Sequence, residues 1–478
     1  MAYINNGENL ILLINPKLVV QKNDTFTTGI IYMPVGLAIF SGGLSELGID
    51  HQVLDLFGLN PAKNTELRER WTFGENLETA AAKFLITPSV VIVYANQAAN
   101  HSEILLIIEQ VLFLFPKASI YILENSQAVT AYSLESVKDQ FKKYRIAGFI
   151  TGTPETQVNT FVNRILKINN SITEPSANWE KFPIENYWRY KLAHGPQTNN
   201  KYLPILTSYG CPWACSFCVV PATNNRKWNS RKSESVYQEI LDLKIKYNVN
   251  EFHLEDLNSS VNTHKLLELA DKIQSLSIIW KIVAGTKAET LDSFETLKKL
   301  HDSGLRYFSF SPESGSNKVK QEIGKRFENQ HSFRLINWSK KLNIKTQACF
   351  VLGMPNEGII DRFRSLSLVR LYSIIGIDEI AVFIISPMPG AKIYSQFNVD
   401  IQNISFSPSW RRDYKKLSFI RLYWYLNFLM LKVLFHPVAF VCSIVRFFNK
   451  NFELKMELAP HRSRQWKKWA KHQVRNLD

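Results

Sequence analysis

Cysteine is scarce in this 478-residue sequence, and the few cysteines present are unevenly placed. Only five occur, and three of them fall between positions 211 and 218, so a disulfide scaffold is excluded as the basis of the fold. No cysteine precedes Cys211. The chain also has no P-loop and no G-x-G-x-x-G fingerprint, which excludes the common nucleotide-binding loops.

Long hydrophobic runs and a secretory leader are missing as well. The longest uncharged stretches, Leu422–Leu431 and Val433–Val445, fall short of the roughly 18 to 20 apolar residues of a membrane span. The first residues, Met1 to Glu8, are polar and lack a basic region, so we expect no signal peptide. The net charge of +15 suits nucleic acid, an anionic membrane surface or an acidic substrate.

The three clustered cysteines form the most informative motif. Their spacing is C-x₃-C-x₂-C, after a strand-like run from Leu203 to Ser208 and a turn at Gly210. Thiolates are soft ligands that suit iron–sulfur clusters or zinc. A cubane cluster held by three cysteines keeps one iron open for a small molecule, whereas a zinc site would need a distant fourth ligand. The predicted ligands are Cys211, Cys215 and Cys218.

This motif resembles that of the radical S-adenosylmethionine (SAM) superfamily, and Phe217 matches the aromatic residue that usually precedes its third cysteine. The resemblance implies a [4Fe-4S] cluster whose open iron chelates SAM. The reduced cluster then cleaves SAM to a 5′-deoxyadenosyl radical. Its electron would come from a donor such as flavodoxin or ferredoxin. Because such a cluster is sensitive to oxygen, we expect a reducing, cytoplasmic location.

Residues 1–168 alternate short apolar runs with helical segments, which predicts an α/β domain with a doubly wound parallel sheet of the Rossmann or flavodoxin type. This half resembles the cobalamin-binding-type domain that precedes many radical SAM cores, through Leu10–Pro16, Met33–Ala38 and Gly152–Glu155. Two features depart from that pattern. No Asp-x-His-x-x-Gly occurs, and Glu124-Asn125-Ser126 replaces the usual Gly-Gly. Cobalamin binding and a degenerate domain without corrin both stay open.

Residues 169–200 read as a linker, and residues 201–400 repeat the alternation with longer units. Six strand–helix units predict a partial (βα)₆ TIM-type barrel, the fold of the radical SAM core. Ser235 and Gln238 read as a capping box at the start of its first long helix. In such barrels the chemistry takes place at the carboxyl ends of the strands.

Several residues after these strands match SAM-binding positions of the family. Glu313 and Ser314 lie in a Glu-Ser-Gly-Ser turn, and Gly353 and Pro355 lie in a Gly-x-Pro-x-Glu turn. Glu255 is placed near the SAM amino group by this resemblance, or else caps a helix. Lys287 would pair with the methionine carboxylate, or else is a solvated lysine. Cys349, within the fifth strand, reads as a buried small hydrophobe.

Residues 401–478 change character, with an apolar segment, Phe419–Phe448, before a tail rich in basic and aromatic residues. His436 and Pro437 predict a bend between two helices. This combination suits contact with the inner membrane surface, and the alternative is a helical cap on the barrel. The tail residues are Arg462, Arg464, Trp466, Lys467, Lys468, Trp469, Lys471 and Arg475.

The sequence therefore predicts a radical SAM enzyme that abstracts hydrogen from an unactivated carbon, with cobalamin-dependent C-methylation as one outcome. Its substrate would be a lipid or a natural-product precursor. The alternatives are a cobalamin-free radical cyclase or coupling enzyme, a tRNA methylthiotransferase, and a non-catalytic iron–sulfur protein. The methylthiotransferase needs three further N-terminal cysteines, which this chain lacks. A nucleic-acid partner is therefore not expected.

Overall fold

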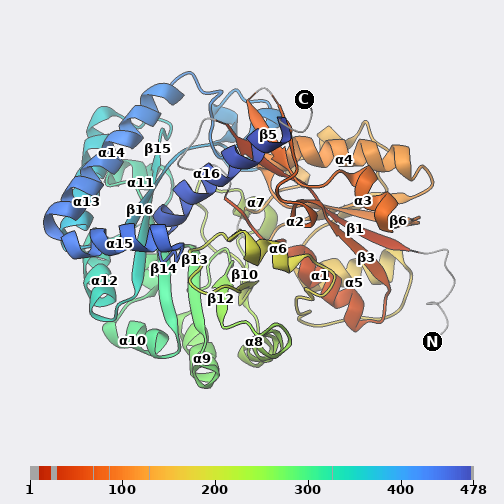
Figure 1. Ribbon diagram of the computed structural model, residues 1–478, viewed down its shortest axis with the longest axis horizontal. Coiled ribbons are helices and arrows are strands. Elements are labelled where there is room, and N and C mark those ends of the chain that lie inside the picture. Colours follow the sequence, from red (N-terminus) through yellow and green to blue (C-terminus); the bar gives the residue numbers. More distant parts are fainter. Residues whose placement is uncertain are drawn as a thin grey trace.

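The computed structural model describes residues 10–22, 30–67, 69–84, 87–128, 130–325 and 327–474. Two parallel sheets lie next to each other, with their helices on the outside (Figure 1). The N-terminal sheet has five strands in the order β3-β1-β6-β7-β8, and every neighbouring pair is parallel. These strands are β1 (Ile11–Asn15), β3 (His51–Asp55), β6 (Val90–Ala95), β7 (Ser119–Glu124) and β8 (Gly148–Ile150).

Helices connect these strands, as the alternating pattern predicts. They are α1 (Val35–Glu46), α2 (Leu56–Leu59), α3 (Leu77–Phe84), α4 (His101–Leu114) and α5 (Pro154–Thr160), the last continued by a π-helical turn over Phe161–Ile165. Between β7 and β8 the connecting helical segment is a 3₁₀ helix, Glu135–Phe141. A small antiparallel sheet that the sequence did not predict contains β2 (Leu18–Gln21), β5 (Arg70–Phe73) and β4 (Asn64–Glu66).

The second sheet has six parallel strands in the order β16-β15-β14-β13-β12-β9, the arrangement of a partial barrel. The predicted fold class, a doubly wound sheet followed by a partial (βα)₆ barrel, is therefore confirmed. Its strands are β9 (Leu203–Ile205), β12 (Glu251–Leu254), β13 (Ile279–Thr286), β14 (Leu305–Glu313), β15 (Lys345–Leu352) and β16 (Glu379–Ile384). The precise domain boundaries given above stay a prediction.

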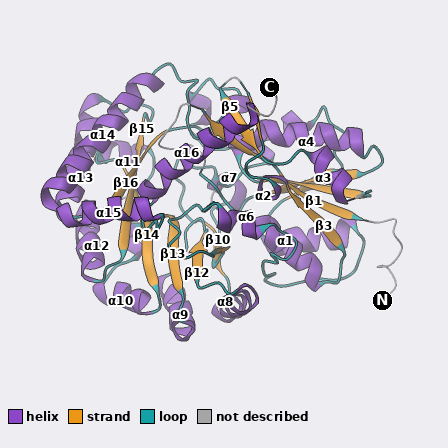
Figure 2. Cartoon of the chain, viewed as in Figure 1, coloured by secondary structure: helices purple, strands orange, loops and turns teal. Residues whose placement is uncertain are grey.

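Helices cover the outside of this barrel and leave the strands to line its interior (Figure 2). They are α8 (Ser233–Tyr247), α9 (Thr263–Ile273), α10 (Phe294–Asp302), α11 (Asn317–Glu322), α12 (Asn329–Lys341) and α13 (Ile359–Ile375). The capping box predicted from Ser235 and Gln238 is wrong. Helix α8 begins two residues earlier, after Lys232, and Gln238 donates to the Glu234 side chain instead.

Three C-terminal helices complete the molecule: α14 (Tyr414–Phe435), α15 (Pro437–Asn449) and α16 (Lys455–Val474). The bend predicted at Pro437 separates α14 from α15. Helix α14 packs beside α13, and α16 crosses from the barrel to the N-terminal half (Figure 1). Within the linker lies α6 (Ile184–Arg189), and α7 (Val220–Asn224) follows the cysteines.

One helix in the described chain, α14, is long and apolar enough to cross a membrane when only length and composition are considered. No such segment was predicted from the sequence, because Arg421 and Lys432 interrupt the uncharged stretches of this helix. In the structure both of these side chains are buried against the protein. About 39% of the most apolar window of α14 is buried inside the protein.

Candidate active site

The cysteine loop is held at its base by a short hairpin of β10 (Ser208–Gly210) and β11 (Trp228–Ser230). Gly210 has φ +83°, and a Cβ there would lie 2.0 Å from the Lys227 carbonyl oxygen, so only glycine fits. Asp256 fixes the start of the hairpin. Its carboxylate accepts from the Thr207 backbone N–H at 3.0 Å and the Ser208 hydroxyl at 2.6 Å.

The middle of the loop is tied to two other parts of the barrel. The Ser216 N–H donates to the Ile323 carbonyl at 2.9 Å, and the Ile393 N–H donates to the Ser216 carbonyl at 3.0 Å. The loop therefore lies beside the end of α11 and the segment that follows β16. This places the cysteines at the carboxyl edge of the parallel strands, where the sequence predicted the chemistry.

Burial controls the state of the three thiols. It raises the pKa of Cys211 and Cys215, and it raises the pKa of Cys218 to about 12, while Lys325 opposes the effect at each of them. Without metal the thiols stay protonated, so iron would displace their protons on binding. The described residues contain no group of three or more His, Cys, Asp or Glu already placed to bind a metal ion.

Glu313 lies near the cysteine loop, at the end of β14. It is buried, its φ is +60°, and its Oε1 lies 2.6 Å from the Lys325 Nζ. Lys325 is itself buried, and the Glu313 carboxylate helps to raise the pKa of this lysine, against the effect of burial. Phe217 packs nearby on the apolar cluster that contains Val319 and Ile323. The structure therefore gathers the cysteine loop, Phe217 and Glu313 in one region.

Ser314, Gly353 and Pro355 occupy turns in this region. The Ser314 hydroxyl lies 3.0 Å from the Ser365 hydroxyl and accepts from the Ser316 N–H, so it is engaged inside the protein. Gly353 has φ +81° and donates its N–H to Glu357 at 2.7 Å. Pro355 is half-buried in the turn that follows. The SAM-binding roles of these residues stay predictions.

Glu255 and Lys287 have identifiable partners. The Glu255 carboxyl group is buried and lies 2.8 Å from His194 Nδ1. Burial raises the pKa of Glu255 well above its ordinary value and lowers the pKa of His194 well below its ordinary value, so it favours the neutral form of each group. The Lys287 ammonium lies 4.7 Å from the Trp213 ring centroid, within the cysteine loop. Their roles toward SAM also stay predictions.

A cavity of about 710 Å³ opens beside these residues and fills the interior of the barrel. Phe217, Glu313 and Cys349 line it, so Cys349 faces this space instead of being a wholly buried hydrophobe. Its other walls come from β16, from α14 and from α16. The volume is large enough for a ligand of cofactor or drug size.

Sequence reasoning missed three residues of this cavity: His194, Lys455 and Arg462. It assigned Arg462 to the exposed basic tail, but this side chain is only 5% exposed. A signal was available, because Leu458, Arg462 and Trp466 recur every four residues and therefore share one helix face. Arg475, the last tail residue named above, lies outside the described residues.

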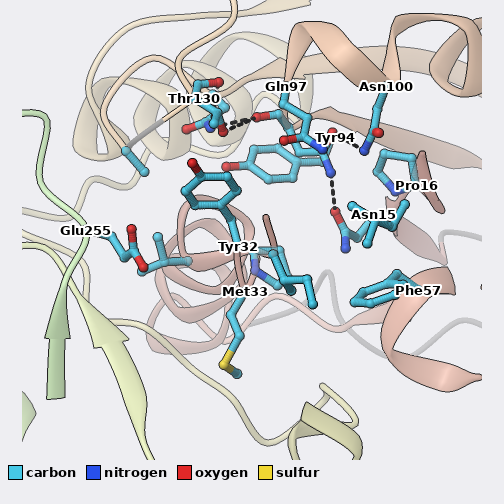
Figure 3. A pocket seen from close by; sticks show the side chains of 17 residues that line it. Asn15, Pro16, Tyr32, Met33, Phe57, Tyr94, Gln97, Asn100, Thr130 and Glu255 are labelled. Carbon is cyan, nitrogen blue, oxygen red and sulfur yellow. Dashed lines mark hydrogen bonds between the residues drawn. The ribbon is translucent and has the colours of Figure 1, made fainter. Parts of the chain in front are cut away.

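A second, much smaller cavity of about 30 Å³ lies at the carboxyl edge of the N-terminal sheet (Figure 3). Tyr32 and Tyr94 lie across it, and side-chain amides including Asn15, Gln97 and Asn100 surround it (Figure 3). Among the described residues, the Gln97 Oε1 is buried without a hydrogen-bond donor. Parallel α/β sheets bind ligands at this edge.

The structure thus combines two parallel α/β sheets with a loop of three cysteines at the carboxyl edge of the second sheet. Residues 205–369 match the Radical SAM superfamily, which confirms the resemblance of the core. The computed structure aligns with that of the radical SAM methyltransferase TsrM from Kitasatospora setae, solved with cobalamin and a [4Fe-4S] cluster bound. The TM-score is 0.59 at 14% identity, over 81% of this chain and 77% of that one. At this identity the likeness shows the fold.

Two curated relatives extend the comparison. Cytidylyl-2-hydroxyethylphosphonate methyltransferase of Streptomyces wedmorensis is 28% identical over 38% of this chain and 34% of its own length. A tRNA-2-methylthio-N(6)-dimethylallyladenosine synthase of Rickettsia canadensis is 31% identical over 45% of this chain and 47% of its own length. The chain thus spans about a third of the first relative and about half of the second.

Proposed function

We propose that this protein is a radical SAM methyltransferase. It would cleave SAM reductively at a [4Fe-4S] cluster and abstract hydrogen from an unactivated substrate carbon, with cobalamin-dependent methyl transfer to follow. The observation that carries the proposal is the position of the cysteine loop, which lies beside Glu313 and the 710 Å³ cavity. The matching superfamily and the cofactors of TsrM support it.

The donor set fits the cluster, since three soft thiols on one loop would bind three irons and keep the fourth open. When bound and reduced, the cluster supplies the electron that cleaves SAM. The chain's own residues would position the substrates. Glu313, held by Lys325, offers a carboxylate to the SAM amino group or ribose, and Phe217 forms an apolar wall.

One buried group at the N-terminal sheet fits cobalamin in its chemistry. A corrin carries amide side chains, and the Gln97 oxygen, which has no donor among the described residues, could accept from one of them. Asn15 and Asn100 already hydrogen-bond to Asp55, Asn96 and Val19. When bound, cobalamin supplies the methyl group for transfer. The cavity of about 30 Å³ is far smaller than a corrin, so Tyr32 and Tyr94 would have to move on binding. Incubation with hydroxocobalamin and gel filtration should yield protein with a corrin spectrum.

A colourless product from that experiment would contradict the cobalamin step. It would favour the degenerate-domain alternative and a cobalamin-free radical reaction. The tRNA methylthiotransferase alternative is disfavoured by the sequence, because no cysteine precedes Cys211. An electron donor such as flavodoxin or ferredoxin and a small-molecule substrate complete the proposal.

The test of the core reaction uses protein reconstituted anaerobically with iron and sulfide. Incubation with SAM and a reductant should release 5′-deoxyadenosine. Cys215→Ala should lose both the cluster and this product, while Cys442→Ala, at an exposed position on α15, should keep both. Product formation by Cys215→Ala, or loss of the cluster in Cys442→Ala, would contradict the three-cysteine assignment.

We also propose that the outer face of α13, α14 and α15 contacts an anionic membrane surface. Of the 23 large hydrophobic side chains that stand exposed in the described chain, 18 lie on these three helices. They include Phe419, Leu426, Met430, Val438 and Phe448. The helices lie together at one side of the molecule (Figure 1). A contiguous exposed apolar face of this kind marks an interaction site.

The orientation of α14 supports this proposal. Two polar residues in its second half point inward, where the Lys432 ammonium donates to the Asp378 carbonyl at 2.8 Å and Asn427 accepts from Arg370. Several of its apolar residues, among them Phe419, Leu426 and Met430, are exposed on the opposite side. Exposed cations, Lys415 and Lys416 at its start and Lys450 after α15, complement an anionic surface. Each cation near such a surface contributes about 1 kcal/mol. An enzyme at a membrane suits a lipophilic substrate.

Co-sedimentation with phosphatidylcholine vesicles, with and without phosphatidylglycerol, tests the membrane proposal. We expect binding that is stronger with the anionic lipid and that Met430→Glu weakens. Ile245→Glu is the matched control, since Ile245 is an isolated exposed residue on α8 with 72% exposure. Failure to bind either vesicle, or dimerisation through this face in gel filtration, would contradict the proposal. Deleting the helices is unsuitable, because α16 contributes to the core.

A further inference from the structure

The large cavity contains a buried cation without a partner. Arg462, on α16, is 5% exposed and lines the cavity. Within the described part of the chain, its Nε and Nη2 atoms have no hydrogen-bond partner, and no ion pair involves its guanidinium group. Buried arginines in proteins are ordinarily paired, because an uncompensated charge in a dry interior is unfavourable. Arg462 therefore has unused capacity to bind an anion.

The residues around Arg462 do not supply that anion. Tyr32 and Tyr202 are the neighbours whose charge would favour the guanidinium, and burial raises the pKa of both phenols, so they are neutral near pH 7. Lys455, which begins the same helix, adds a second cation; its ammonium donates to the Val283 carbonyl at 2.7 Å. Burial lowers the pKa of Arg462 to about 10, which still leaves the group charged.

The rest of the cavity is largely apolar. Its walls include side chains from β13, β15, β16, α14 and α16, namely Val283, Val351, Ile380, Phe383, Leu429 and Leu458. A ligand that is polar throughout, or that carries several charges, would make few favourable contacts with these apolar walls. A ligand that fits must bring apolar bulk for these walls and acceptor oxygens for the guanidinium, which is built to hold a carboxylate or phosphate by two parallel hydrogen bonds.

We propose that the substrate is an amphiphile with an apolar body and one anionic group, a carboxylate or a phosphate, and that Arg462 binds that group. This inference rests on the proposed function, because it takes the cavity to be the substrate site. The same cavity is lined by Phe217 and Glu313 beside the cysteine loop. With the anion held by Arg462, the apolar body occupies the remaining space, and one of its unactivated carbons faces the radical.

The test measures binding of a probe and needs no turnover. The probe is 8-anilino-1-naphthalenesulfonate, an apolar aromatic anion, and the comparison is the uncharged N-phenyl-1-naphthylamine, which has the same rings without the sulfonate. Titrations of full-length protein, followed by fluorescence, give the dissociation constant for each. The matched control variant is Arg464→Met, because Arg464 is the same residue type on the same helix but is exposed.

We expect Arg462→Met to weaken binding of the anionic probe by about ten-fold or more, since charge-assisted hydrogen bonds are lost, and to change binding of the neutral probe by less than about two-fold. The affinity of Arg462→Lys for the anionic probe should lie between those of Arg462→Met and the unchanged protein. Arg464→Met should affect neither probe. Because adsorption to the exposed helices is common to all variants, the difference isolates the cavity.

Arg462→Met should also not lower the thermal unfolding midpoint, because removal of an unpaired buried charge breaks no interaction. Equal affinity of Arg462→Met and the unchanged protein for the anionic probe would overturn the inference. A lowered midpoint with equal loss of both probes would overturn it too, since Arg462 would then be structural. Release of 5′-deoxyadenosine from SAM, measured separately, reports on the proposed function alone.

Discussion

At the scale of single residues, Glu313 has a left-handed backbone conformation at the end of β14. A glutamate at φ +60° is uncommon, and such conformations persist when the surroundings impose them. Here the constraint comes from Lys325, whose ammonium lies 2.6 Å from the carboxylate, and from burial of both groups. The carboxylate is thereby held at the strand end, next to the cysteine loop.

Glu313→Gln should therefore weaken SAM binding without removing the cluster. The loss of a charge-assisted hydrogen bond predicts a rise of about ten- to a hundred-fold in the dissociation constant of SAM. Equilibrium binding to reconstituted protein measures this, and iron analysis checks the cluster. Glu322→Gln, at an exposed position on α11, is the control and should bind SAM normally. Unchanged affinity in Glu313→Gln would remove this carboxylate from the SAM site.

The sequence could predict the cysteines and Glu313, because each lies in a short motif whose spacing carries the information. It could not predict Arg462 as part of the cavity. That role depends on α16 passing the open side of the barrel, a contact between segments far apart in the chain. A basic residue among other basic residues reads as solvated unless its helix face is considered. The inward orientation of Arg421 and Lys432 was missed for the same reason.

At the scale of elements, α4 begins at a histidine that is held neutral by burial. His101 is buried, its Nδ1 lies 2.5 Å from the Tyr132 hydroxyl, and burial lowers its pKa to about 4. The unfolded chain has a pKa near 6.5 at this residue. Between pH 6.5 and pH 4 the unfolded state therefore binds more protons, and the stability that His101 contributes above pH 6.5 is lost as the pH falls.

Acidification should thus reduce the free energy of unfolding, with about 2–3 kcal/mol attributable to His101 once the pH reaches 4. Urea unfolding at a series of pH values measures this. His101→Gln should flatten the dependence over this window, while His264→Gln, at an exposed position on α9, should leave it as it was. A curve for His101→Gln that matches the unchanged protein would mean that His101 does not titrate as described.

The helices and strands differ in how well the sequence pattern predicts their presence and their ends. Strands such as β1 and β6 are nearly continuous apolar runs, and the alternation of such runs with helical segments predicted both parallel sheets. The small sheet of β2, β5 and β4 was not predicted, because its strands are only four, four and three residues long and β2 pairs with β5 across a long separation in sequence. The start of α8 was misplaced because its N-cap residue is Lys232, whose side chain makes no capping hydrogen bond, so the sequence does not mark this position as a helix start.

At the scale of the whole molecule, α16 connects the two sheets. Its first turn is fixed to the barrel, where the Lys455 and Met456 N–H groups donate to the Glu379 carboxylate. Further along, Trp466 is fully buried against Phe57 and Phe73 of the N-terminal half, with ring centroids 6.5 Å and 4.6 Å away. The tail that the sequence assigned to a membrane surface is thus partly buried, and α16 packs against both halves of the molecule.

Because α16 packs on both parts, we expect the N-terminal half and the barrel to stabilise each other. Trp466→Ala removes a large buried ring and should lower the free energy of unfolding by about 3–5 kcal/mol. Because the ring joins α16 to the N-terminal half, the same change should speed proteolysis of the linker, residues 169–200. The cysteine loop is held by hydrogen bonds to barrel residues, so cluster content should persist. Lys467→Ala, the exposed neighbour, is the control. If Trp466→Ala unfolded at the same urea concentration and its linker resisted protease equally, α16 would pack on the N-terminal half without holding it to the barrel.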